Sequence, residues 1–261
     1  MNRSNIPKIA NTPEDKILLA KLWDKINLGI RKNIFSSTHF LSPRELDMSR
    51  YLFGQQEGLR SFGGYTNAER QMLVYMPDYL EDAFLFQEES PITCLRASFS
   101  QADSLSHRDF LGALMSIGIS RDAIGDICVG SSTCDFFVIA EIAPYILQEL
   151  TQAGGAKLLV SRIPISDAQV AESATKQIKD TIASLRLDSV IASGFRISRG
   201  TAAQYITSGK AAINGLPCEK PDKTVDVGCK ISLRGYGKIK LTGVNGLTKK
   251  GRYSVIIDRY I

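Results

Sequence analysis

Residues 185–215 restrict what this chain can fold into more than any other part of its sequence. Before Gly194, three apolar side chains recur at the spacing of one helix face: Leu187, Val190 and Ile191. Ser198 is a good N-cap for a second helix, and Gly209 is a natural stop for it. Asn214-Gly215 is the dipeptide most typical of a tight β-hairpin. The segment therefore predicts two short helices that pack together and lead into a small sheet.

Charge divides the chain near the same place. From Ser184 to the C-terminus there are 14 Lys/Arg and 5 Asp/Glu residues, a net charge of +9, whereas the first 183 residues contain 18 and 22, a net charge of −4. The value for the whole chain, +5, hides this asymmetry. A compact segment with this charge attracts polyanions. Nucleic acid is favoured over a membrane surface because no amphipathic basic helix accompanies the charge.

The chain is predicted to be an α+β protein with two regions before the basic one. In residues 1–78, which we expect to be mainly helical, apolar side chains share one helix face over residues 14–29. Ser42-Pro43-Arg44-Glu45 is a capping box with proline at the first helical position, so a second helix should begin there. An apolar run at residues 72–76 predicts a strand.

The middle region, residues 79–166, alternates short apolar runs with helical stretches in the order β-α-β-β-α-β. The expected elements are strand 92–99, helix 106–115, a hairpin of strands 124–129 and 135–140, helix 141–153 and strand 157–163. This is the ferredoxin-like order, which RNA-recognition motifs share with many unrelated functions, so the region is a candidate RNA-binding domain. Residues 167–183 are polar and are predicted to form a helix that links it to the basic domain, residues 184–261.

Several other classes of protein find little support. Five cysteines lack zinc-ligand spacing, so we expect neither a metal nor a cofactor, although Cys128 and Cys134 leave a local disulfide open. The apolar runs are too short for a membrane span, and the N-terminus lacks the apolar core of a signal peptide. The chain has only two histidines, so a histidine-based site for acid–base catalysis is not favoured. Since neither a membrane span nor a signal peptide is indicated, we expect a cytoplasmic protein. We also expect it to be a monomer.

The basic domain resembles the S4 (αL-type) RNA-binding domain. The family pattern is matched in order by Arg186-Leu187-Asp188, Ser198-Arg199, Gly209, Asn214-Gly215 and Gly228. The sequence departs from that pattern at Cys229, where the family usually has aspartate, and at Ala211-Ala212, which replace a valine-containing strand start. The resemblance implies binding to structured RNA through the first helix and the start of the second.

The same resemblance implies which residues contact RNA. Arg186 and Arg199 are the leading candidates because guanidinium groups contact phosphates in a bidentate manner. Ser198 would either add an anion site together with the N–H groups of the helix start or serve only as an N-cap. For Arg186, the alternative to RNA contact is an ion pair with Asp188. Supporting contacts are expected from Arg196, Thr201 and Lys210. A basic extension, or else a solvated charged hairpin, would comprise Arg234, Lys238, Lys249, Lys250 and Arg252.

S4 domains also occur in enzymes, but the signatures of those enzymes are missing. Arg186-Leu187-Asp188 superficially resembles the catalytic aspartate motif of pseudouridine synthases, but the residues after it do not. The glycines in residues 153–156 lead into a predicted strand, which is the wrong order for a methyltransferase. His107-Arg108-Asp109 copies a kinase tripeptide without the other kinase motifs, and a helix start explains it better. We predict no catalytic residue, with an RNA-modifying enzyme as the alternative.

Segments on both sides of the S4 core form a second set of motifs. The matching runs are Phe62-Gly63-Gly64-Tyr65, Ala68-Glu69-Arg70, His107-Arg108-Asp109-Phe110-Leu111-Gly112-Ala113, Gly118-Ile119, Ile124-Gly125-Asp126-Ile127, Arg234-Gly235-Tyr236-Gly237-Lys238 and Thr248-Lys249-Lys250-Gly251-Arg252. These runs resemble the YlmH-type S4 proteins of bacteria. The resemblance implies a non-catalytic protein that binds ribosomal RNA and tRNA on the large ribosomal subunit, in the quality control of stalled nascent chains. An adaptor linked to cell division, with a protein partner for the first two domains, is the alternative.

Overall fold

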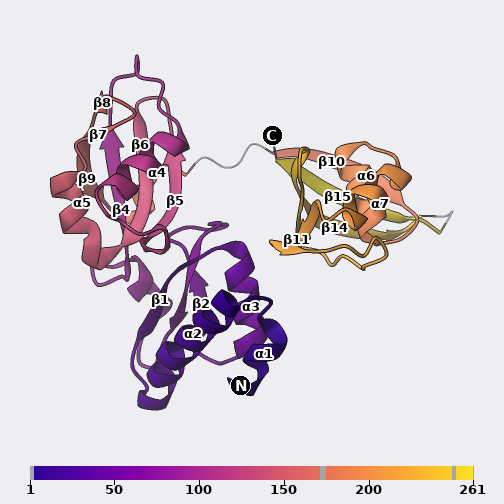
Figure 1. Ribbon diagram of the computed structural model, residues 1–261, viewed down its shortest axis with the longest axis horizontal. Helices are drawn as coiled ribbons and strands as arrows, with labels where there is room; N and C mark the ends of the chain where they lie inside the picture. Colours follow the sequence, from indigo (N-terminus) through magenta and orange to yellow (C-terminus); the bar gives the residue numbers. More distant parts are fainter. Residues whose placement is uncertain (1–2, 171–174, 249–250, 261) are drawn as a thin grey trace. The chain divides into compact units, whose positions relative to one another are not determined.

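The computed structural model describes residues 3–170, 175–248 and 251–260. It divides into two compact units, Met1–Ala171 and Glu172–Ile261. Figure 1 shows that each unit contains both helices and sheets, which confirms the α+β class predicted from the sequence.

The first part of the N-terminal unit is a three-stranded antiparallel sheet with helices beside it. Its elements are α1 (Ile6–Ile9), α2 (Pro13–Lys32), β1 (Ser36–Leu41), α3 (Pro43–Phe53), β2 (Leu59–Phe62) and β3 (Gln71–Tyr75), with strand order β1-β3-β2. Capping boxes start both long helices, at Thr12 and at Ser42. The two helices and the strand expected from the sequence are present. The region is nevertheless mixed where a mainly helical one was expected, because β1 and β2 contain few apolar residues and are fixed by pairing with β3.

The second part of this unit has the expected β-α-β-β-α-β order. Its elements are β4 (Ile92–Ser98), α4 (His107–Ser116), β5 (Ile124–Val129), β6 (Thr133–Ile139), α5 (Ala143–Glu149) and β9 (Leu159–Ile163), with a small hairpin of β7 (Gln152–Ala153) and β8 (Ala156–Lys157). The strand order is β5-β6-β4-β9, and every neighbouring pair is antiparallel. This is the ferredoxin-like arrangement. The connecting 3₁₀ turns of the unit are η1 (Arg3–Asn5), η2 (Asp82–Phe86), η3 (Arg121–Ala123), η4 (Ala140–Ile142) and η5 (Ile165–Asp167).

Both faces of the ferredoxin-like sheet are covered. On one face, Leu95 and Phe136 pack with α4 and α5 in a buried cluster. On the other face, Cys94 and Phe137 form a single core with residues of β1 and β3, and Ile163, Ile165, Ala168 and Val170 pack against it. The open sheet face on which an RNA-recognition motif stacks bases is therefore occupied here by protein.

The C-terminal unit packs two helices against a six-stranded sheet. Its elements are β10 (Thr175–Ile182), α6 (Leu187–Phe195), α7 (Arg199–Thr207), β11 (Ala211–Ile213), β12 (Leu216–Pro217), β13 (Lys230–Leu233), β14 (Gly237–Leu247) and β15 (Tyr253–Tyr260). The strand order is β10-β15-β14-β13-β11-β12. Leu187, Val190 and Ile191 are fully buried with Ile239 and Ile257 of the sheet, as their helical spacing predicts.

The predicted linking helix over residues 167–183 was wrong. Residues 175–182 form strand β10, which pairs with β15 along its whole length. Ile178 and Ile182, the buried residues of this strand, are four positions apart, a spacing that fits one face of a helix and one face of a strand equally well. The distant partner β15 decides between the two.

Two general features of the fold bear on function. No helix in the described part of the chain has both the length and the apolar character needed to cross a bilayer. The five cysteines all lie in the described residues and none forms a disulfide, so the bond between Cys128 and Cys134 that the sequence left open is not formed. Within residues 3–170, 175–248 and 251–260, no three His, Cys, Asp or Glu side chains are grouped as metal ligands.

Candidate RNA-binding site

The corner between α6 and α7 is built around the buried carboxylate of Asp188. Asp188 lies in the first turn of α6 and is 4% exposed. Arg186, the N-cap residue of α6, donates from Nη2 to Asp188 Oδ2 at 3.1 Å and from Nε to Oδ1 at 3.3 Å. Arg199, the first residue of α7, places Nε 3.1 Å from the same Oδ2. The two leading candidates for RNA contact therefore meet on one acidic side chain.

This corner keeps a positive charge. Burial opposes ionisation of Asp188, but hydrogen bonds from Arg186 and Arg199 outweigh it and hold the pKa of Asp188 below its ordinary value of 3.8. The single carboxylate balances only one of the two guanidinium groups. The arginine side chains are 40% and 50% exposed, so each keeps N–H donors toward solvent. The pairing of Arg186 with Asp188 that the sequence left open is present, and it leaves donors for phosphate oxygens.

Ser198 and Thr201 cap the start of α7. The Thr201 N–H donates to Ser198 Oγ at 3.0 Å, and the two hydroxyl oxygens lie 2.7 Å apart. These contacts support the N-cap role of Ser198 over a direct RNA contact. The N–H groups of Arg199 and Gly200 come before the first intrahelical bond of α7, donated by Ala202, and have no partner in the described part of the chain. They are suited to an anion.

A second basic group lies at the other end of α7, around two tyrosines. Lys210 Nζ lies 4.8 Å from the centre of the Tyr205 ring, and the N–H of Arg234 donates to the Lys210 carbonyl at 3.0 Å. The hydroxyl oxygens of Tyr205 and Tyr236 lie 3.3 Å apart. Lys238 follows at the start of β14. The structure thus brings two predicted contact residues, Lys210 and Arg234, together and adds a tyrosine pair that was not singled out from the sequence.

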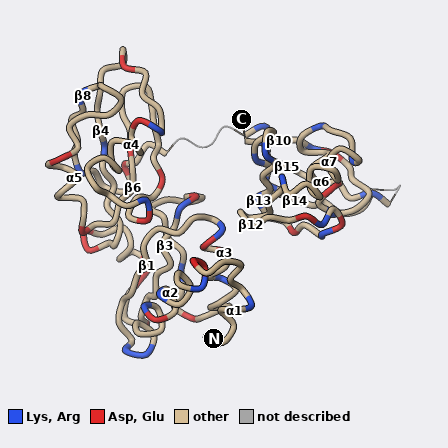
Figure 2. The backbone as a smooth tube through the Cα atoms, viewed as in Figure 1, with Lys and Arg blue, Asp and Glu red and all other residues tan. Residues whose placement is uncertain are grey.

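Basic positions in the described part of the C-terminal unit recur on several elements rather than on one helix (Figure 2). Arg196 ends α6 in the left-handed conformation, with φ of 56°, and is exposed. Arg252 is tied to β10, since it donates to the Thr181 carbonyl and, at 3.3 Å, to Thr181 Oγ1. The other two predicted residues, Lys249 and Lys250, lie outside the described residues.

One hollow of the C-terminal unit brings together Arg199 and Arg252. It has a volume of about 330 Å³ and is lined also by Ser189, Ser193 and Asp180. Ser193 Oγ donates to Asp180 Oδ2 at 2.7 Å, so that carboxylate already has a partner. Two guanidinium groups beside hydroxyl groups suit a phosphate oxygen. The sequence did not predict that these two arginines lie together, because residues 199 and 252 are far apart along the chain.

Asp188 is the organising residue that sequence reasoning missed. Its identity was visible in the Arg186-Leu187-Asp188 motif, but there it was treated only as an alternative partner for Arg186. Its contact with Arg199 requires α6 and α7 to fold back on each other, which sequence spacing does not specify. A useful signal was available, because an aspartate in the first turn of an apolar helix is placed to accept hydrogen bonds there.

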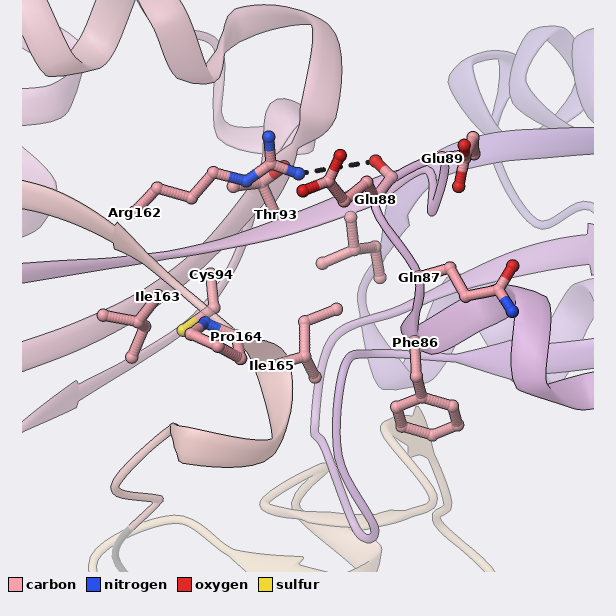
Figure 3. A pocket seen from close by; sticks show the side chains of 11 residues that line it. Phe86, Gln87, Glu88, Glu89, Thr93, Cys94, Arg162, Ile163, Pro164 and Ile165 are labelled. Atoms are coloured by element: carbon pink, nitrogen blue, oxygen red, sulfur yellow. Dashed lines mark hydrogen bonds between the residues drawn. The ribbon is translucent and has the colours of Figure 1, made fainter.

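The N-terminal unit has a hollow of about 570 Å³ beside β4 and β9 (Figure 3). Arg162 Nη2 donates to the Glu88 carbonyl at 3.4 Å across its rim. Thr93 lines the hollow, is 2% exposed, and its Oγ1 has no hydrogen-bond partner among the described residues. No nucleophile hydrogen-bonded to a base occurs among the lining side chains that are described, so we assign no catalytic step to this hollow.

The kinase-like tripeptide of the sequence is the start of a helix. The backbone N–H and the hydroxyl of Ser106 both donate to Asp109 Oδ2, at 2.8 and 2.7 Å. These hydrogen bonds hold the pKa of Asp109 below its ordinary value. His107 and Arg108 are the first two residues of α4. The capping interpretation of this motif is confirmed.

Comparisons with known proteins fit this architecture. A family model described as "Putative RNA-binding domain in YlmH" matches residues 96–167, and the S4 domain model matches residues 185–231. The Ribosome-associated protein quality control protein P2 of Bacillus subtilis (strain 168) is 35% identical over 226 residues, which cover 85% of this chain and 86% of that protein. The structure of Cell division protein ylmH from Streptococcus pneumoniae has a similar fold, with a TM-score of 0.51 at 18% identity over 62% of this chain and 97% of that chain.

Proposed function

The chain belongs to the YlmH-type family of S4-domain RNA-binding proteins, and from this premise we propose that it binds ribosomal RNA and tRNA on the large ribosomal subunit. The observation that carries the proposal is the pair of arginines held by Asp188, Arg186 at the start of α6 and Arg199 at the start of α7. Two partly exposed guanidinium groups, each at the N-terminus of a helix, form a phosphate site that needs little reordering. The name of the Bacillus relative supports a role in the quality control of stalled nascent chains, and with it a cytoplasmic location.

The site is tested with a triple variant, Arg186→Gln with Asp188→Asn and Arg199→Gln. It removes both guanidinium groups without leaving a buried charge unpaired, so folding should be kept. Binding to purified large subunits, measured by cosedimentation, should weaken by about 100-fold or more, because two charge-assisted contacts are lost. Filter binding of purified tRNA tests the second ligand in the same way.

Two controls accompany this experiment. Lys179→Gln removes an exposed charge of β10 and should leave binding unchanged. Asp188→Asn alone keeps both arginines and should bind RNA. If the triple variant is folded by circular dichroism and binds subunits and tRNA like the wild type, the assigned site is wrong.

We further propose that the protein acts without catalysis. The matched families are RNA-binding domains, and the predicted contact residues are arginines, lysines and capping hydroxyls rather than an acid–base pair. The rRNA and tRNA of cells that lack the protein should show an unchanged set of modified nucleosides by mass spectrometry. Loss of one modification that the purified protein restores would identify an enzyme instead.

A further inference from the structure

A hollow in the N-terminal unit gathers four basic side chains. It has a volume of about 490 Å³ and lies between α2, β1, the start of α3 and the turn η3. The basic side chains of its lining are Lys21, Lys25, Arg70 and Arg121. The apolar part of its lining consists of Leu18, Leu22, Phe40 and Leu41. A hollow of this size suits a ligand as large as a nucleotide.

The two arginines are fixed side by side by backbone carbonyls. Arg70 donates from Nε to Ile124 O at 2.9 Å and from Nη2 to Phe40 O at 3.1 Å. Arg121 donates from Nη1 to the same Ile124 O at 2.7 Å and to Gly125 O at 3.2 Å. Since a guanidinium has five N–H donors, Nη1 of Arg70 and both Nε and Nη2 of Arg121 keep donors for a ligand.

Neither arginine forms a close ion pair among the described residues, although Glu45, Asp126 and Asp122 attract Arg70 and Asp126 attracts Arg121. Both are partly buried, and burial lowers the pKa of each below the ordinary arginine value. The charge of Arg70 lowers the pKa of Arg121 further. Two like charges held together with little solvent are unfavourable, and a bound anion would relieve that repulsion.

Two carboxylates, Glu45 and Asp122, belong to the same lining, and each also has a hydrogen-bond partner of its own. Glu45 accepts the backbone N–H at the N-cap of α3 at 2.7 Å, and Asp122 lies 2.8 Å from His39 Nδ1. Asp126 accepts a tyrosine hydroxyl and two backbone N–H groups, at 2.8, 2.6 and 3.0 Å. Four basic side chains against two carboxylates leave this lining with a net positive charge, which attracts an anion from solution.

We propose that this hollow binds the phosphate group of a nucleotide, with the base against the apolar lining. Arg70 and Arg121 would contact the phosphate through their remaining N–H donors, and Lys21 and Lys25 of α2 would add positive charge to the same lining. The nucleotide is either a free mononucleotide or the 5′-phosphorylated end of an RNA. This site lies in a different unit from the S4 site, so either can fail without the other.

Calorimetry on the full chain tests the proposal with AMP, inorganic phosphate, adenosine and a short RNA with or without a 5′-phosphate. The S4 triple variant serves as background, so that RNA does not bind there. We expect AMP to bind at least about tenfold more tightly than adenosine, since the charged contacts need the phosphate. Preference for AMP alone supports a free nucleotide, and preference for the 5′-phosphorylated RNA supports an RNA end.

Variants on one helix give the matched comparison. Lys21→Glu with Lys25→Glu should weaken AMP binding by about tenfold or more, and Arg121→Gln should do the same. Lys16→Glu reverses an exposed charge of α2 outside the hollow and should change nothing. The proposal is overturned if neither phosphate ligand binds better than its unphosphorylated counterpart, or if the folded Lys21→Glu, Lys25→Glu variant binds AMP like the wild type.

Discussion

Asp188 links stability to pH through a single buried side chain. Since its pKa is depressed in the folded protein, its ion pairs contribute fully above 3.8 and are lost as the pH falls through the lowered folded value. Asp188→Asn should reduce the free energy of unfolding by about 1–2 kcal/mol at neutral pH, because charge-assisted hydrogen bonds become neutral ones. Urea denaturation should show this difference shrinking below pH 3.8. A difference that stays constant with pH would assign the effect to packing instead.

Replacing Thr93 with valine is expected to stabilise the folded protein. Its buried hydroxyl has no partner among the described residues, and valine has nearly the same shape without a polar group to bury. Thr93→Val should raise the free energy of unfolding by about 1 kcal/mol. Thr38→Val is the matched control, since the Thr38 hydroxyl donates to His39 O at 2.7 Å and accepts the Leu73 N–H at 2.9 Å. Thermal unfolding should move the two variants in opposite directions, and a lower stability for Thr93→Val would mean that its hydroxyl is satisfied.

At the scale of elements, β10 is part of the C-terminal core rather than a linker. Ile182 is 4% exposed and packs in the same cluster as Val190 and Ile257. Ile182→Ala should destabilise the protein by about 2–4 kcal/mol because a cavity forms in that core. Lys179→Ala, on the same strand but exposed, should stay within about 0.5 kcal/mol of the wild type in urea denaturation. Equal stability of the two variants would show that β10 is not needed for the core.

A helix or strand could be predicted from the sequence when interactions between residues close in the sequence define it. Capping boxes and apolar spacing are local, so α2, α3, α6 and α7 were predicted close to their observed bounds. Strands β10, β14 and β15 were missed because each is defined by a partner strand rather than by its own composition. Intrinsic strand preference is weak compared with pairing and burial.

The candidate site shows the same division. Arg186 and Arg199 were predicted from a local motif, whereas their shared contact with Asp188 depends on how two helices pack. Arg252 was placed in a basic extension, but its position beside Arg199 arises because Arg252, just before β15, donates to Thr181 of β10. Residue types were thus accessible from sequence, and their grouping required the tertiary structure.

For the whole molecule, the separation of charge predicts how binding depends on salt. If Lys210 and Arg234 contact phosphates, replacing either with glutamine should reduce the slope of log affinity against log salt by about 0.7–0.9. The affinity should fall by a similar factor for different RNA sequences, since phosphate contacts do not read bases. Lys16→Gln, in the N-terminal unit, should leave the slope unchanged. A slope that none of these variants changes would remove the group around Tyr205 from the RNA site.

The burial of both faces of the ferredoxin-like sheet limits how its domain meets other molecules. With helices on one face and β1, β3 and residues 163–170 on the other, a partner has no broad flat surface to lie on. What this domain still offers is its border strand β9 and the outer sides of α4 and α5, because the carbonyls at the start of the other border strand, β5, already accept from Arg70 and Arg121. Leu159 of β9 is 76% exposed, so one border presents an apolar side chain to solvent. Recognition by this domain is therefore expected to be edge-on, with strand-to-strand or helix-side contacts in place of base stacking.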